Sequence, residues 1–170
     1  MEEIRNKVAE SGLITINLEQ YYPDNQPMAF DLKNFLFMEM LLKEKDFREA
    51  LDQHDWSIYE GRDVAVYCST DAIVPMWAYM LVASKLSGTA RSIVSGTPEE
   101  AFKQVFIQNI QQVDAAAFEA KRVVVKGCGD KPVPEYAYAA ISIKLLPVVK
   151  SLMYGEPCST VPVYKRKEKA

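Results

Sequence analysis

Short runs of β-branched and other apolar residues alternate along the chain with longer segments that have the composition of helices. The runs at residues 64–67 and 123–126 are typical of buried strands. Pro75 and Pro134 each open a segment rich in Ala and Tyr, and proline is favoured in the first turn of a helix. The apolar segment 30–42 fits a buried helix and a buried strand equally well. The predicted strands are 13–18, 64–67, 93–95, 123–126 and 148–154, and the predicted helices are 2–10, 46–53, 75–87, 98–112 and 134–146.

Residues 47–98 and 106–157 resemble each other at a constant offset of 59 positions. Of the 52 aligned positions, 16 are identical. The matches concentrate in the phrase Asp-x-x-Val-Pro-x-x-Ala-Tyr, which begins at Asp71 in the first copy and at Asp130 in the second. Because repeats decide architecture, we interpret this similarity as an internal duplication that organises the fold.

The alternation of strands and helices predicts parallel strands, because a helical crossover is the usual connection between them. We therefore expect an α/β fold with one open, mostly parallel, doubly wound sheet built from the internal duplication. We expect a single domain over residues 1–164, made of an N-terminal segment, 1–46, and the two repeats. The basic residues 165–170 are expected to form a frayed, solubilising tail.

Composition and charge exclude some classes of function. The 170 residues include 20 basic and 23 acidic side chains, a net charge of −3, which argues against binding to nucleic acid. No apolar run is long enough to span a membrane, and residues 1–5 do not resemble a signal peptide. We expect a cytoplasmic protein whose thiols stay reduced.

The three cysteines all follow predicted strands. Cys68 follows the first strand of the repeats, Cys128 the third, and Cys158 the fourth. Ligands of doubly wound sheets bind at the carboxyl ends of the strands, so we expect the three sulfurs to converge there if the first and third strands are neighbours. Three thiolates would suit zinc or an iron–sulfur cluster. The alternative is that each cysteine is a small buried residue.

Polar residues accompany the first two cysteines. Ser69 and Thr70 follow Cys68, and we expect them to shape the ligand loops together with Asp71 and Asp130. The two aspartates precede the helix-opening prolines, where a carboxylate favours capping of the helix over a role as general base. His54, the only histidine, precedes the first repeat strand and is expected to be structural.

Four phrases carry a resemblance to a known family. They are His-Asp-Trp-Ser at 54–57, Cys-Ser-Thr-Asp-Ala-Ile-Val-Pro-Met-Trp-Ala-Tyr at 68–79, Lys-Gly-Cys-Gly-Asp-Lys-Pro-Val-Pro at 126–134 and Gly-Glu-Pro-Cys-Ser-Thr-Val-Pro at 155–162. With these phrases, nearly the whole chain resembles an uncharacterised bacterial family, a domain of unknown function. The resemblance implies no activity, but it implies a genomic association with iron–sulfur cluster assembly.

Together these observations predict a metal- or iron–sulfur-binding protein that uses Cys68, Cys128 and Cys158, linked to cluster assembly. Iron–sulfur assembly proteins and a second copy of the chain are the expected partners. The alternative is a non-enzymatic interaction module with structural, buried cysteines. The sequence does not decide whether the protein is an enzyme, because it contains no recognisable constellation of acid and base residues.

Overall fold

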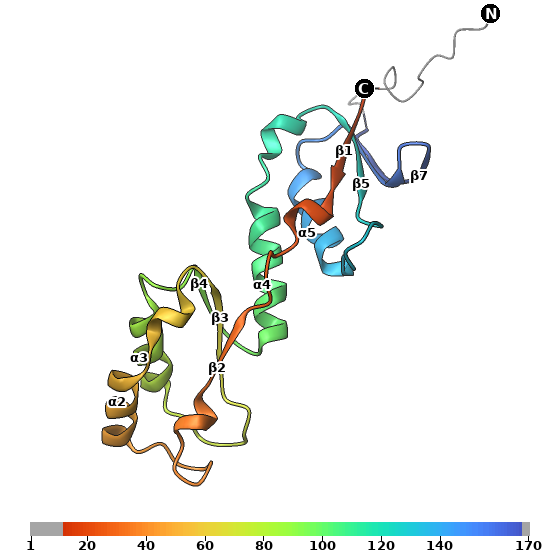
Figure 1. The fold of residues 1–170 in the computed structure, drawn as a ribbon. Helices are drawn as coiled ribbons and strands as arrows, with labels where there is room; N and C mark the ends of the chain where they lie inside the picture. Colours follow the sequence, from red (N-terminus) through yellow and green to blue (C-terminus); the bar gives the residue numbers. More distant parts are fainter. Residues whose placement is uncertain (1–11, 168–170) are drawn as a thin grey trace, which may run out of the picture. The chain divides into compact units, whose positions relative to one another are not determined.

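The structure is a computed structural model that describes residues 12–167, and the chain divides into two compact units (Figure 1). Unit 1 comprises Met1–Tyr22 and Phe106–Ala170, and unit 2 comprises Pro23–Val105. The second boundary lies inside helix α4 (Pro98–Gln111). Unit 1 is therefore assembled from the two ends of the chain, and unit 2 from its middle.

Unit 2 contains a sheet of three parallel strands in the order β2-β3-β4. Figure 1 shows its two helices, α2 and α3, on the same side of β2 and β3. Val64 and Val66 of β3 pack in one core cluster with residues of these helices, whereas Ala65 packs with Ala101 of α4. Burial of β3 on both faces explains its continuous apolar sequence. The bounds are β2 Met28–Asp31, β3 Asp63–Tyr67, β4 Ser92–Ser95, α2 Glu44–Gln53 and α3 Met76–Leu86.

Unit 1 contains a sheet of four strands in the order β1-β5-β6-β7. The first three strands are parallel, and β7 returns antiparallel to β6 through a hairpin. Helix α5 contributes buried Ala137, Ile141 and Leu145. The bounds are β1 Leu13–Asn17, β5 Arg122–Lys126, β6 Ser151–Glu156, β7 Ser159–Lys165 and α5 Glu135–Leu145.

Several elements of residues 47–98 have counterparts in residues 106–157 at the offset of 59 residues. β5 has the bounds of β3 plus 59, and α5 has those of α3 plus 59. The same offset relates the short 3-10 helices η3 (Trp56–Tyr59) and η4 (Ala115–Phe118), whose N-caps Asp55 and Asp114 each accept a hydrogen bond from the residue two positions on. A residue of one unit can therefore be compared with its counterpart in the other.

The predicted class, mixed α/β with open and mostly parallel sheet structure, is confirmed. The strands nevertheless form two sheets, and the first and third repeat strands are not neighbours, so the condition for convergence of the three sulfurs is not met. The reason is that the N-terminal region supplies an edge strand to each sheet: β2 pairs with the free side of β3, and β1 pairs with the free side of β5. Pairing between β3 and β5 is thereby blocked. The single-domain prediction for 1–164 stays a prediction.

Other local expectations changed as well. The undecided segment 30–42 contains the end of β2 and the 3-10 helix η2 (Leu32–Phe35), and β7 was not predicted. A 3-10 helix, η1 (Leu18–Tyr21), likewise follows β1. The helix predicted for residues 2–10 lies outside the described residues. Among the helices of residues 12–167, none has the length and apolar character needed to cross a membrane.

Candidate functional site

The three cysteines occupy different surroundings. Cys68 is half-buried in unit 2, where its thiol donates to the Thr70 carbonyl at 3.5 Å. Cys128 and Cys158 are exposed and belong to unit 1. Cys128 follows β5 by two residues, and Cys158 lies in the turn between β6 and β7. Each cysteine follows a strand, as expected, but the strands belong to two sheets.

The predicted metal or iron–sulfur function is wrong. Within residues 12–167, no group of three His, Cys, Asp or Glu side chains is arranged to hold a metal ion. The physical reason is the division into two sheets, which puts the loop of Cys68 and the loop of Cys128 in different units. The expected zinc ion or iron–sulfur cluster therefore has no three-cysteine ligand set within the described residues. The alternative, in which all three cysteines are buried structural residues, is also wrong, because Cys128 and Cys158 are exposed.

Cys128 lies beside two tyrosines at the carboxyl end of the unit 1 sheet. Its sulfur is 3.3 Å from the hydroxyl of Tyr154, which projects from β6. The ring of Tyr154 meets that of Tyr138, from α5, edge to face with centroids 5.6 Å apart. Val125 of β5 pairs with Tyr154 of β6, and this register brings the Tyr154 side chain close to the loop that follows β5. Two phenols thus converge on one solvent-accessible thiol.

These contacts change the acidity of the groups. The hydrogen bond from Tyr154 lowers the pKa of the Cys128 thiol; desolvation opposes this effect, and the Tyr138 hydroxyl and the Gly127 backbone add to it. The charge of Glu156 acts in the opposite direction. The pKa of Tyr138 is raised to about 12, mainly because the side chain is desolvated by burial and secondly because of the nearby Cys128. At neutral pH the phenols stay protonated and donate hydrogen bonds, which favour the thiolate.

Two glycines make this arrangement possible. A Cβ atom on Gly127 would lie 2.6 Å from the Tyr138 hydroxyl oxygen, far inside van der Waals contact. A Cβ atom on Gly129 would collide with the carboxylate of Glu19, which accepts a hydrogen bond from the Gly129 N–H. The segment Gly-Cys-Gly therefore allows Tyr138 and Glu19, from η1, to approach the loop closely.

The corresponding loop of unit 2 is built differently. Ser69 is the counterpart of Cys128, and its N–H donates to the Asp31 carboxylate at 3.0 Å. Asp31 also accepts from the Lys33 N–H at 2.9 Å. Desolvation raises the pKa of Asp31, but the hydrogen bonds from Ser69 and Lys33 outweigh it and lower the pKa overall. Here the carboxylate of Asp31 ties the loop to the adjacent strand, and the thiol of the loop, Cys68, donates to the backbone carbonyl of Thr70.

The aspartates predicted to cap helices do not do so. α3 and α5 have Pro75 and Pro134 at their N-caps, without a side-chain capping bond. Asp71 and Asp130 are exposed. Thr70 holds its loop through its backbone carbonyl, which accepts hydrogen bonds from the Cys68 thiol and from the Ala72 N–H. The loop-shaping role assigned to these residues and to Ser69 stays a prediction.

The site can act as a nucleophile or an electron donor, but it lacks the usual base of a cysteine hydrolase. His54 is the only histidine in the chain, and it packs among the aromatic rings of unit 2, 3.4 Å from the Tyr59 hydroxyl. A lowered thiol pKa needs no separate base for attack, because the thiolate is already present in part. The geometry of Cys128 therefore favours thiol exchange over acyl transfer.

Sequence reasoning did not identify Tyr154 or Tyr138 as residues of a site. A signal was present in the repeat: Tyr154 replaces Ser95, and Cys128 replaces Ser69, at positions where the two copies otherwise form the same elements. Glu19 carried no such signal, because it lies 110 residues from Gly129 in the sequence.

Comparison with known proteins gives a family and no activity. The family model described as "Protein of unknown function (DUF2480)" matches residues 2–166. No curated protein and no solved structure matches the chain.

Proposed function

Because the chain belongs to this family of unknown function, as its resemblance predicted, we propose an activity from its own geometry: Cys128 is the nucleophile of a thiol–disulfide exchange reaction. The observation that carries this proposal is the approach of the exposed Cys128 sulfur to the Tyr154 hydroxyl at 3.3 Å, with Tyr138 packed against the same phenol. The substrate is a small-molecule or protein disulfide.

The proposed reaction has two balanced steps. The Cys128 thiolate attacks one sulfur of the substrate disulfide, so that a new S–S bond forms, the old one breaks, and the other sulfur leaves as a thiolate. A thiol from solution then attacks the mixed disulfide and releases Cys128. Tyr154 stabilises the attacking thiolate before the first step and the departing Cys128 thiolate in the second. No external oxidant is needed, because the substrate disulfide is itself reduced.

The proposed reaction requires a reducing compartment. Cys128 must return to the thiol form between turnovers, which requires a supply of low-molecular-weight thiols. The proposal therefore retains the cytoplasmic location predicted from the sequence. The expected links to iron–sulfur assembly proteins and to a second copy of the chain stay predictions.

The reactivity of the three thiols tests the proposal directly. We expect the folded protein to react with an aromatic disulfide reagent at pH 7 in a fast phase that Cys128→Ser abolishes. Cys158→Ser is the matched control, because Cys158 is also exposed but has no tyrosine hydroxyl at hydrogen-bonding distance within the described residues. If Cys158 accounts for the fast phase, or if no fast phase occurs, the proposal is wrong.

A second variant isolates the role of the phenol. Tyr154→Phe removes a hydrogen bond to the thiolate and should therefore raise the pKa of Cys128. The rate of reaction then reaches half of its plateau at a higher pH. At pH 7 the rate should fall only about threefold, because a more basic thiolate is also more nucleophilic. An unchanged pH–rate profile would show that Tyr154 does not act on the sulfur.

A further inference from the structure

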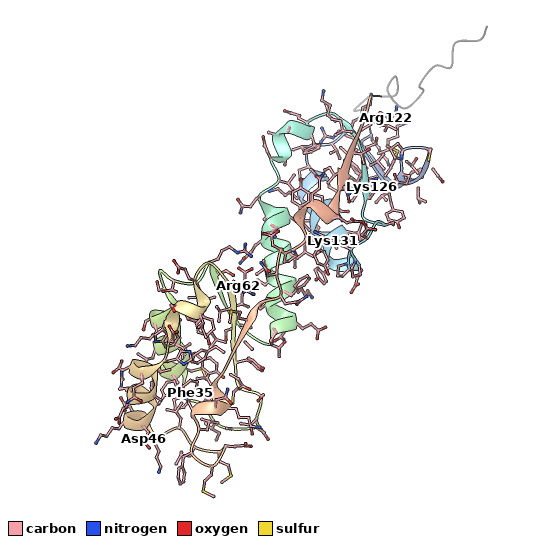
Figure 2. The ribbon with its side chains drawn as sticks, viewed as in Figure 1. Phe35, Asp46, Arg62, Arg122, Lys126 and Lys131 are labelled. Carbon is pink, nitrogen blue, oxygen red and sulfur yellow. The ribbon has the colours of Figure 1, made fainter. Side chains whose placement is uncertain are left out.

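The segment that follows β1 lies against the loop that carries Cys128. Asn17, the last residue of β1, pairs with Lys126, the last residue of β5. The 3-10 helix η1 and the loop 127–134 therefore leave the sheet at neighbouring positions. Figure 2 shows Lys126 at the end of β5 and Lys131 farther along this loop.

η1 is itself fixed at several points. Leu18 is buried, and the Asn17 side chain accepts the N–H of Glu19 at 3.1 Å. The Tyr21 carbonyl accepts a hydrogen bond at 3.0 Å from the side-chain amide of Asn109, which belongs to α4. A side chain that projects from η1 therefore has a firm support.

Glu19 connects η1 to the loop. Its carboxylate accepts a hydrogen bond from the N–H of Gly129, the residue after Cys128. The φ of Gly129 is not positive, so backbone conformation does not require a glycine there. Space does, because a Cβ atom on Gly129 would collide with the Glu19 carboxylate. The bond thus depends on a carboxylate that reaches the loop and on a loop residue that leaves room for it.

The contact of Cys128 with Tyr154 needs such support. Glycines on both sides, Gly127 and Gly129, make the backbone around Cys128 intrinsically flexible. The Cys128 sulfur nevertheless lies 3.3 Å from the Tyr154 hydroxyl. Because hydrogen bonds weaken steeply with distance and misalignment, the contact requires a loop that is held in one position. The bond from Gly129 to Glu19 provides this restraint next to the reactive residue.

Unit 2 anchors its corresponding loop in a related way. The carboxylate of Asp31, at the end of β2, accepts the N–H of Ser69 at 3.0 Å. Ser69 is the counterpart of Cys128, whereas in unit 1 Glu19 binds one residue later, at Gly129. A carboxylate from the N-terminal strand region therefore anchors the loop in both units, and unit 1 combines this anchor with an exposed thiol.

We infer that Glu19 is the positioning residue of the thiol site: by holding Gly129, it keeps the Cys128 sulfur within hydrogen-bonding distance of Tyr154. This inference rests on the proposed thiol–disulfide exchange and names a further residue on which the reaction depends. Glu19 acts through the loop backbone. Its charge also adds to burial and to the nearby Cys128 in raising the pKa of Tyr138 to about 12, which keeps that phenol protonated.

Positioning and charge predict opposite effects of Glu19 on the acidity of Cys128. Loss of the bond to Gly129 weakens the hydrogen bond from Tyr154 and raises the pKa of the thiol. Loss of a nearby negative charge by itself favours the thiolate and lowers the pKa. Glu19→Ala removes the bond and the charge, whereas Glu19→Gln removes the charge but keeps an oxygen that can accept the Gly129 N–H. The sign of the change therefore separates the two roles.

The pH dependence of alkylation by iodoacetamide tests the inference in the full chain. Cys68→Ser and Cys158→Ser are included so that Cys128 is the only thiol. We expect Glu19→Ala to raise the midpoint of the pH–rate profile and Glu19→Gln not to raise it. Gly129→Ala displaces the carboxylate from the loop side and should also raise the midpoint. An unchanged or lower midpoint in Glu19→Ala and Gly129→Ala would overturn the inference.

Two comparisons place the effect at the contact with Tyr154. Asp31→Ala breaks the corresponding bond of unit 2 and should leave the midpoint of Cys128 unchanged. In a Tyr154→Phe background, Glu19→Ala should raise the midpoint much less, because the contact that it supports is already lost. An equal rise in Asp31→Ala, or an undiminished rise in the Tyr154→Phe background, would refute the role of Glu19.

The exchange rate separates this inference from the proposed function. At pH 7, Glu19→Ala should react with the aromatic disulfide reagent about threefold more slowly, as expected for Tyr154→Phe. Alkylation involves no disulfide, so unchanged midpoints with fast exchange at Cys128 would refute the role of Glu19 alone. Slow exchange with the expected midpoints would refute the proposed function and leave Glu19 as the residue that positions the thiol.

Discussion

Individual residues at corresponding positions give the two units different chemistry on similar backbones. Ser69 donates its N–H to Asp31, while its counterpart Cys128 presents a thiol to Tyr154. Asp63 belongs to an ion pair and is 4% exposed, while its counterpart Arg122 is an exposed cation. In each case a different side chain at a corresponding position changes the chemistry of that place in the fold.

The Asp63 ion pair should contribute measurably to stability. Asp63→Asn removes the buried anionic partner of Arg91 and leaves its ion pair with the exposed Asp24, and we expect the free energy of unfolding at pH 7 to fall by about 2 kcal/mol. The value is below that of a fully buried pair because the Arg91 side chain is 45% exposed. The control Asp52→Asn breaks the exposed pair with Lys85 and should cost less than about 1 kcal/mol. Urea unfolding measures both, and equal losses would contradict this ranking.

The same pair predicts a dependence on pH. Desolvation raises the pKa of Asp63, but the hydrogen bonds from Arg91 and Ser92 outweigh it, so the pKa is lowered in the folded state. The stabilisation is therefore complete above the unfolded-state value, near 3.9, and is lost as the pH falls through the folded-state value. The difference in unfolding free energy between the wild type and Asp63→Asn should narrow between about pH 5 and pH 3. A constant difference would show that the carboxylate charge is not responsible.

Among the elements, turns and helix starts are reproduced most closely between the repeats. Pro75 and Pro134 precede helices of the same length, and the strands β3 and β5 coincide at the offset. The loop before each strand also coincides: Gly61 donates its N–H to the Thr89 carbonyl, and Ala120 donates to Val148, both at 2.9 Å. Both residues have a positive φ, +66° for Gly61 and 55° for Ala120.

This conformation predicts opposite effects of two exchanges. Gly61→Ala introduces a Cβ atom into a left-handed conformation and should lower the free energy of unfolding by about 1 kcal/mol. Ala120→Gly removes the same strain and should raise it by about 0.5 kcal/mol. Space is not the cause, since a Cβ atom on Gly61 meets no atom within 4 Å. Thermal unfolding of both variants would measure the difference, and shifts of the same sign would contradict it.

At the scale of the whole molecule, each sheet is completed by a strand from the N-terminal region. β1 pairs with β5 and β2 pairs with β3, so the earlier strand joins the later repeat. The two N-terminal strands have the same local form, because each is followed by a 3-10 helix. Asn17 and Asp31 are the N-caps of these helices, and each side chain accepts a hydrogen bond from the N–H of the residue two positions on. Unit 1 therefore combines β1, which comes early in the chain, with β5, β6 and β7, which come late.

This connectivity predicts how fragments behave. Residues 23–105 contain every strand of the β2-β3-β4 sheet and should fold alone, whereas residues 106–170 lack β1 and should not. Adding a peptide of residues 1–22 to the second fragment should restore structure, because it supplies the missing edge of β5. Circular dichroism and urea titration would follow both fragments. Cooperative unfolding of 106–170 without the peptide would show that β1 is dispensable.

The sequence by itself determined the elements that depend on neighbouring residues. The β-branched runs gave β3 and β5, the prolines gave the starts of α3 and α5, and the constant offset predicted that both copies form the same structures. These features are local, because side-chain shape and backbone preference act over a few residues. The alternation of elements was sufficient to predict the mixed α/β class.

Only the tertiary structure decided which strands pair and which side chains meet. Occupation of the edges of β3 and β5 by β2 and β1 separates the repeats into two sheets, and it excludes the predicted three-cysteine site. The contact of Cys128 with Tyr154 joins residues 26 apart through the register of β5 with β6, and the hydrogen bond from the Arg166 N–H to the Lys150 carbonyl joins the end of β7 to the start of β6. Such contacts depend on which strands compete for the same sheet edge. A short stretch of sequence does not contain that information.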